Sequence, residues 1–263
     1  VYKALHTSVS LSWTIGVALG VIAKKSIDVG RQFDTAMSSA AATANASGED
    51  FNKMREAALE MGRTTSKTAS ESANALAYTA LAGWDVDTSI AALPSVLKLS
   101  EASGMDLART SDLVTDSMAS LGLAVNDLPG YLDVATKAQN SSNQSAEQLM
   151  EAYLNVGGTM KDLGVPIEES ATALGVLANR GRKGGEARQA LSAIMTNLTT
   201  GTGQAGKMMN QLGISAFDSS GKFRVPTLCL QKVNEATKGL SDEERNAALA
   251  ALGGKQHVKD LNK

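Results

Sequence analysis

The residues whose spacing first suggests chemistry are three glycines in the stretch TTGTGQAGK, residues 199–207. They form Gly201-x-Gly203-x-x-Gly206, which is the spacing of a dinucleotide-binding turn. That turn needs a strand before it, a crossover helix after it and an acid roughly 20 residues further on. Here the preceding residues have a helical apolar pattern, and the following helix ends near Gly213. The glycines therefore predict a flexible turn between two helices, which is a candidate hinge.

The hypothesis of a nucleotide-binding enzyme rests on these glycines alone. It predicts saturable nucleotide binding that the substitution Gly203→Val abolishes. Ser95-Val-Leu-Lys98 has the S-x-x-K spacing of serine acyl-enzymes, but the S-D-N and K-T-G motifs that complete such sites are missing. The basic cluster at 179–188 has no interleaved aromatic residues, which favours a solvated loop over a nucleic-acid site. The sequence thus predicts no enzyme, no cofactor, no metal and no specific nucleic-acid binding.

The composition favours a helical protein and shows no excess of charge that would favour nucleic-acid binding. Aromatic residues make up only 4% of the 263 residues, so the core must be built from Ala, Leu, Val and Met. Alanine has the highest helix propensity, which favours an all-α fold. The net charge of −2 gives no basic excess for nucleic acid, and the single cysteine, Cys229, excludes an intrachain disulfide.

Glycine interrupts the helical pattern about every 20 residues, which predicts a mainly α fold, a bundle of short glycine-separated helices. We expect one small β-hairpin near 214–226, with a glycine turn, and a possible helix break at Gly157-Gly158. Residues 71–83 resemble residues 169–181 at an offset of 98. The offset leaves open whether the bundle consists of two pseudo-repeated sub-bundles.

The most apolar segment, VSLSWTIGVALGVIA at 9–23, is shorter than the roughly 20 residues that span a bilayer. Gly16 and Gly20 have the spacing of a close helix pair. This pattern favours a helix packed on the same protein or on another copy, and a membrane-active or pore-forming module stays as the alternative. Phe33 and Trp84 are further candidates for packing or for an interface.

We expect three parts: an N-terminal apolar or amphipathic helix at 1–45, a helical core at 46–203, and a hairpin with C-terminal helices at 204–263. The chain begins with Val and ends within a helical pattern, so we expect it to be a fragment of a longer protein.

Several motifs, in order, resemble the core region of the tape measure proteins of long-tailed phages. A helix carrying Phe-Asp and Met leads to a Gly-x-Thr-Thr turn, an Ala-rich helix ending in Ala-Gly-Trp, two further Leu/Ala blocks and a Gly-Lys hairpin. In this sequence these motifs are Phe33-Asp34 with Met37, Met61 to Thr65, Ala69 to Trp84, Val96 to Ala108, Leu177 to Leu191, and Asp218 to Arg224. Each motif is weak alone, but their order and spacing are specific, and together they cover most of the chain.

The resemblance implies a structural virion protein in the lumen of the tail tube, made in the cytoplasm of the host bacterium. Such proteins set tail length, take part in tail assembly and leave the tail ahead of the DNA. Implied partners are other copies in a homo-oligomer, tail tube and tail tip proteins, tail assembly chaperones, and the host membrane. The glycine breaks add a qualification, because a globular domain of this length has a radius of gyration of roughly 18 Å. We therefore expect a folded module of the tape measure protein, without a continuous measuring helix.

Overall fold

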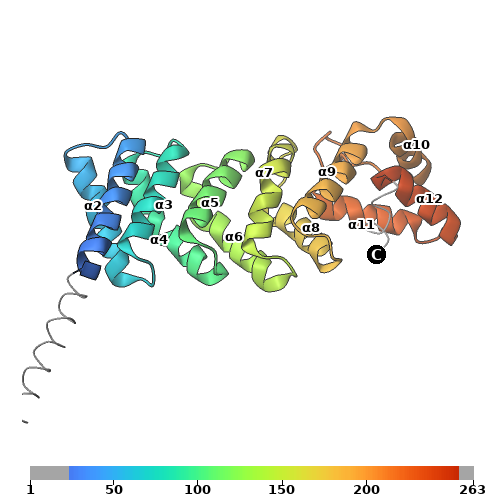
Figure 1. The fold of residues 1–263 in the computed structure, drawn as a ribbon. Coiled ribbons are helices and arrows are strands. Elements are labelled where there is room, and N and C mark those ends of the chain that lie inside the picture. Colours follow the sequence, from blue (N-terminus) through green and yellow to red (C-terminus); the bar gives the residue numbers. More distant parts are fainter. Residues whose placement is uncertain (1–23, 255–263) are drawn as a thin grey trace, which may run out of the picture. The chain divides into compact units, whose positions relative to one another are not determined.

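The computed structural model describes residues 24–254, which are mainly helical (Figure 1). Contacts within the chain divide it into two compact units, Val1–Pro94 and Ser95–Lys263. The boundary lies inside helix α4 (Val86–Ser103), at Pro94. The described helices span at most 20 residues, in keeping with the bundle of short helices that the glycines predict. The three-part division at residues 45 and 203 stays a prediction.

The first unit packs a helix at 24–43 against α2 (Glu49–Thr64), and α2 against α3 (Ala69–Leu81). Apolar side chains on the first helix are buried at steps of three and four residues, which is the pattern of one helix face. They are Phe33, Ala36, Met37, Ala40 and Ala41. The Arg55 guanidinium of α2 lies 5.2 Å from the centre of the Phe33 ring and 3.8 Å from the Asp34 carboxylate, which joins the two helices.

The second unit contains the rest of α4 and a series of shorter helices. Their bounds are α5 (Leu107–Leu121), the 3-10 turn η1 (Val125–Asp127), α6 (Leu128–Ser141), α7 (Ala146–Asp162), α8 (Ile167–Asn179), α9 (Gly185–Thr200), α10 (Gly203–Leu212), α11 (Pro226–Thr237) and α12 (Asp242–Gly253). The chain alternates between two layers, with α5, α7 and α9 side by side in one and α6, α8 and α11 in the other (Figure 1). Helices α10 and α12 pack on each other and on α9.

A regular spacing underlies this arrangement. Helices α3, α5, α7 and α9 begin at residues 69, 107, 146 and 185, so each helical hairpin takes 38 or 39 residues. Polar caps start three of these helices: Thr68 and Ser145 form capping boxes, and Asp106 accepts backbone hydrogen bonds. The offset of 98 seen in the sequence superposes α3 on α8. It therefore relates the first helix of one hairpin to the second helix of another, which is a different relation from the hairpin repeat.

Two local expectations were wrong. At 214–226 a single antiparallel bridge joins Phe217 and Phe223, and no strand forms among residues 24–254. The arms are too short for a ladder, because α10 ends at Gly213 and α11 begins at Pro226. The Asp218 carboxylate instead accepts two backbone N–H groups inside the turn, at 2.8 and 3.0 Å.

The helix break expected at Gly157-Gly158 does not occur, since α7 runs through both glycines to Asp162. At Gly157 helix α5 lies so close that no side chain would fit, as described below.

Candidate interaction surface

The three glycines of the opening motif form a tight corner between α9 and α10. Gly201 ends α9 with a φ of 58°, in the left-handed region that favours glycine. A Cβ atom on Gly206 would overlap the carbonyl of Gly201, so only glycine permits this approach of the two backbones. A helix precedes the motif where a dinucleotide site needs a strand. Whether Gly201, Gly203 and Gly206 act as a hinge stays a prediction.

The other predicted residues lie in different settings. Gly16 and Gly20 lie outside the described residues, as does the whole apolar segment at 9–23. Phe33 is buried in the first unit under Arg55. Trp84 is half-buried just after α3, and its backbone N–H donates to the carbonyl of Thr79 at 3.1 Å. A role for either aromatic residue at a subunit interface stays a prediction.

Within residues 24–254, no helix combines the length and apolar character needed to cross a membrane. Over the same residues, no group of three or more His, Cys, Asp or Glu side chains is placed to hold a metal ion.

Two buried tyrosines join the helices of two hairpins in the second unit by hydrogen bonds. The sequence analysis did not identify either of them. Tyr131 of α6 donates its hydroxyl to Ser117 Oγ of α5 at 2.6 Å. Tyr153 of α7 donates to the carbonyl of Ile167 at 3.1 Å and lies 2.9 Å from Ser170 Oγ, both in α8. Burial raises the pKa of both phenols, so both stay neutral. Their burial could have been predicted from the sequence, because each tyrosine lies at helical spacing among the apolar residues of α6 or α7.

Adjacent hairpins meet through a close approach of α5 and α7. Ser120 Oγ of α5 donates to the carbonyl of Tyr153 at 2.7 Å, and a Cβ atom added to Gly157 would overlap this serine. Nearby, Arg109 of α5 reaches Glu151 at 2.7 Å and Glu147 at 3.2 Å, both on α7. These charged side chains are about 40% exposed, so the ion pairs contribute roughly 1 kcal/mol or less. Small residues therefore fix the spacing of the two helices.

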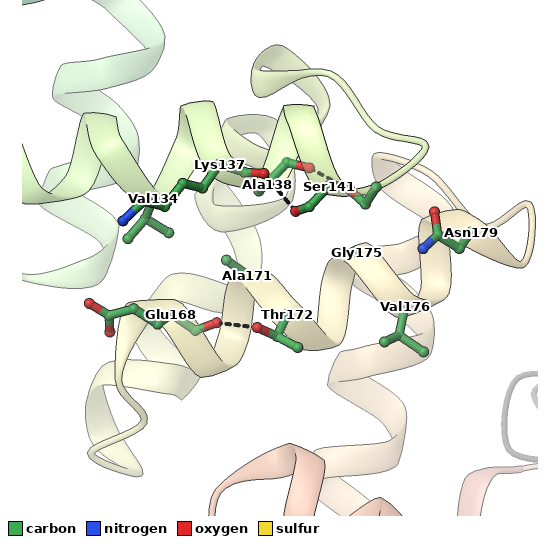
Figure 2. A pocket seen from close by; sticks show the side chains of 11 residues that line it. Val134, Lys137, Ala138, Ser141, Glu168, Ala171, Thr172, Gly175, Val176 and Asn179 are labelled. Carbon is green, nitrogen blue, oxygen red and sulfur yellow. Dashed lines mark hydrogen bonds between the residues drawn. The ribbon is translucent and has the colours of Figure 1, made fainter.

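Helix α8 separates two grooves on the second layer. One lies between α6 and α8, has a volume of about 260 Å³, and is lined by small, hydroxyl and valine residues together with Lys137, Glu168 and Asn179 (Figure 2). The other lies among α8, α9 and α11, has a volume of about 330 Å³, and contains Leu191, Ile194 and Leu230. Thr172 and Val176 line both grooves, and Val176 is 40% exposed. The apolar groove among α8, α9 and α11 suits the side chains of a packed helix.

Comparison with known proteins gives the chain its relatives. The family described as phage-related minor tail protein matches residues 55–254. The tape measure protein of Pneumococcus phage Dp-1 is 31% identical over 259 residues, which cover 98% of this chain and 22% of that protein. A probable tape measure protein of Escherichia phage P2 is 27% identical over 184 residues, covering 70% of this chain and 22% of that protein. No solved structure matches.

The chain thus spans about a fifth of the length of the curated relatives it matches. The family match begins within α2 and runs to the end of α12, so it covers the stacked hairpins of the second unit and the part of the first unit from residue 55 onward. This chain belongs to the phage-related minor tail protein family, among the tape measure proteins of phage tails.

Proposed function

We propose that this chain is a folded structural module of a tape measure protein, which acts in tail assembly without catalysis. The observation that carries the proposal is the family match over a continuous series of helical hairpins. The module lies with the rest of the polypeptide in the lumen of the tail tube of the virion, after synthesis in the bacterial cytoplasm. Its partners are other copies, tube and tip proteins and assembly chaperones, and it leaves the tail when DNA is ejected.

The architecture determines how much tail length this module can account for. A continuous helix gains about 1.5 Å per residue, so 39 residues would add roughly 60 Å of length. In a stack of hairpins the same residues advance the structure by one interhelical distance, about 8–10 Å. A folded hairpin therefore contributes about a sixth of the length of an extended helix.

Deleting one hairpin from the gene in its phage tests the proposal. Removal of residues 107–145, which are α5 and α6, takes out one repeat and joins Asp106 to Ala146, so that Asp106 replaces Ser145 as the N-cap of α7. We expect shorter tails in electron micrographs, by about 60 Å if the segment is extended in the tail and by about 10 Å if it stays folded. Deletion of α7 and α8 at 146–184 is the matched control and should shorten tails equally. Unchanged tail length in both deletions would contradict a measuring role.

The alternative function, a membrane-active or pore-forming module used at DNA delivery, depends on residues 9–23, which lie outside the described residues. It predicts that the chain binds liposomes and that Val17→Asp abolishes binding. If the chain does not bind liposomes, that result would count against this alternative and against host membrane contact through this segment.

A further inference from the structure

The two grooves of the second layer have the same construction. Lys137 of α6 lines the first groove, and Val176 of α8, 39 residues later, lines the second. Across the grooves, Thr172 of α8 corresponds to Gln231 of α11, 59 residues later. These shifts equal those between the first residues of α6, α8 and α11, which are 128, 167 and 226. Equivalent residues of neighbouring helices therefore lie in rows that cross the layer.

One of these rows, here called the charged row, presents its charges in a definite order. Its members are exposed and follow one another at shifts of 39, 39 and 59 residues: Lys98 of α4, Lys137 of α6, Val176 of α8 and Glu235 of α11. The Nε2 atom of Gln139 donates to the carbonyl of Ala102 at 3.3 Å, which joins the end of α4 to α6. Figure 2 shows Lys137 and Val176 on the two helices that flank the first groove.

The charges of this row are available to a partner. Within residues 24–254, none of Lys98, Lys137 and Glu235 forms an ion pair. Val176 is 40% exposed and lies on the wall between the two grooves. A complementary partner therefore carries two negative charges, an apolar side chain and a positive charge, in this order.

The spacing of the row favours an extended partner. Packed helices lie about 8–10 Å apart, so the members of the row follow one another at about this interval. A polyproline II segment returns to the same side after three residues, which is about 9.3 Å. An α-helix does so after seven residues, roughly 10.5 Å, and a β-strand after two, roughly 6.6 Å. Over three intervals only the polyproline II segment stays in step with the row.

A second row supplies hydrogen bonds for an extended backbone. Asn140 and Asn179 lie three residues beyond Lys137 and Val176, and both are exposed. Figure 2 shows Asn179 at the end of the first groove. Its Oδ1 atom accepts the backbone N–H of Asn143 at 2.7 Å, and its amide nitrogen remains a donor. A polyproline II backbone has no internal hydrogen bonds, so its carbonyls can accept from such amides, whereas a helical backbone satisfies its own.

We propose that the charged row binds an extended segment of a partner protein. The segment has acidic residues at its first and fourth positions, an apolar residue at its seventh and a basic residue at its tenth. Its carboxylates lie against Lys98 and Lys137, its apolar side chain against Val176, and its basic group against Glu235. The inference goes beyond the proposed function. Its test measures peptide binding in solution, so its failure leaves the tail-length proposal intact, and unchanged tail length leaves the peptide site intact.

A reciprocal charge exchange tests the site in the full 263-residue chain by fluorescence anisotropy. The probe is the labelled peptide Glu-Pro-Pro-Glu-Pro-Pro-Leu-Pro-Pro-Lys, whose prolines favour the extended form. Lys137→Glu places like charges together and should raise the dissociation constant about tenfold. A second peptide with lysine at its fourth position should bind Lys137→Glu about tenfold more tightly than the wild type. Lys207→Glu on α10 is the matched control and should bind the first peptide like the wild type.

Circular dichroism of each variant separates a lost site from a lost fold, and the gain expected with the second peptide cannot come from unfolding. The proposal would be overturned if the wild type bound neither peptide at millimolar concentration. Equal affinities of both peptides for the wild type and for Lys137→Glu would also overturn it. So would an equal loss of binding in Lys207→Glu, because it would indicate attraction by overall charge alone. A peptide with the same four residues at every second position should bind more weakly, and equal binding would contradict the three-residue spacing.

Discussion

The adjacent glycines of α7 offer a sharp test of how the hairpins are spaced. Gly157 and Gly158 both lie in the interior of the helix, but their surroundings differ. A Cβ atom on Gly157 would overlap Ser120 of α5 and come within 3.0 Å of its backbone carbonyl carbon. A Cβ atom on Gly158 would meet nothing within 4 Å. The same substitution should therefore have opposite effects one residue apart.

The magnitudes follow from two competing contributions. Replacing glycine by alanine within a helix stabilises it by about 0.8–1.0 kcal/mol, and this gain applies at both positions. At Gly157 the added methyl group must push α5 away, and overpacking of this kind costs typically 1–3 kcal/mol. It also strains the hydrogen bond from Ser120 Oγ to the carbonyl of Tyr153. We expect Gly158→Ala to stabilise by up to about 1 kcal/mol, and Gly157→Ala to destabilise by up to about 2 kcal/mol.

Urea unfolding followed by circular dichroism measures the difference, with the slope checked for each variant. The double variant Gly157→Ala/Ser120→Gly removes the serine side chain and should recover part of the loss, which a double-mutant cycle with Ser120→Gly quantifies. Equal stabilisation by Gly157→Ala and Gly158→Ala would refute the reasoning, because it would mean that α5 and α7 are not held at this distance.

Three further predictions follow from single sites. Gly206→Ala should lower amide-exchange protection at the start of α10, measured by mass spectrometry, because its methyl group would overlap the Gly201 carbonyl; unchanged protection would contradict this contact. Tyr153→Phe should lower the free energy of unfolding by about 1–2 kcal/mol in urea titration, because the hydroxyl bonds to α8 are lost. Burial raises the pKa of the Cys229 thiol from 9.0 to about 11. The unfolded thiol then ionises first, so stability should fall from pH 9 to 11, and this fall should be smaller in Cys229→Ala.

The helical class and the helix ends could be predicted because they depend on local chemistry. Capping residues such as Ser145 and Ser241, and glycines such as Gly122 and Gly213, satisfy backbone groups within a few residues of themselves. The turn at 214–226 was misread for the same reason, since a glycine turn between apolar residues predicts a hairpin locally. Only the distance between α10 and α11 along the chain shows that the arms are too short to form strands.

The interaction surface could not be predicted, because it depends on which helices become neighbours. Nothing local marks Val176 as exposed, since its helix is apolar on most sides and several of its neighbours are buried. Likewise, Gly157 reads as a helix breaker until α5 is placed against it. The hairpin period of 38 or 39 residues could not be seen in the sequence, because the corresponding helices share little sequence similarity. The similarity at offset 98 relates α3, the first helix of its hairpin, to α8, the second helix of another.

The second unit is held together by polar contacts within its hairpins and by packing between them. The tyrosine hydrogen bonds lie within hairpins, joining α5 to α6 and α7 to α8. Between α5 and α7 the polar contacts are those of Ser120 and the partly exposed Arg109. In stacked repeats, stability is a sum of repeat and nearest-neighbour contributions, so both classes of contact count toward it. The rings of Tyr131 and Tyr153 also meet across the two hairpins, with their centroids 6.2 Å apart, and α5 and α7 form the most extensive helix pairing among the described residues. Hydrogen bonds therefore hold the two helices of a hairpin to each other, and the packing of α5 against α7 holds one hairpin to the next.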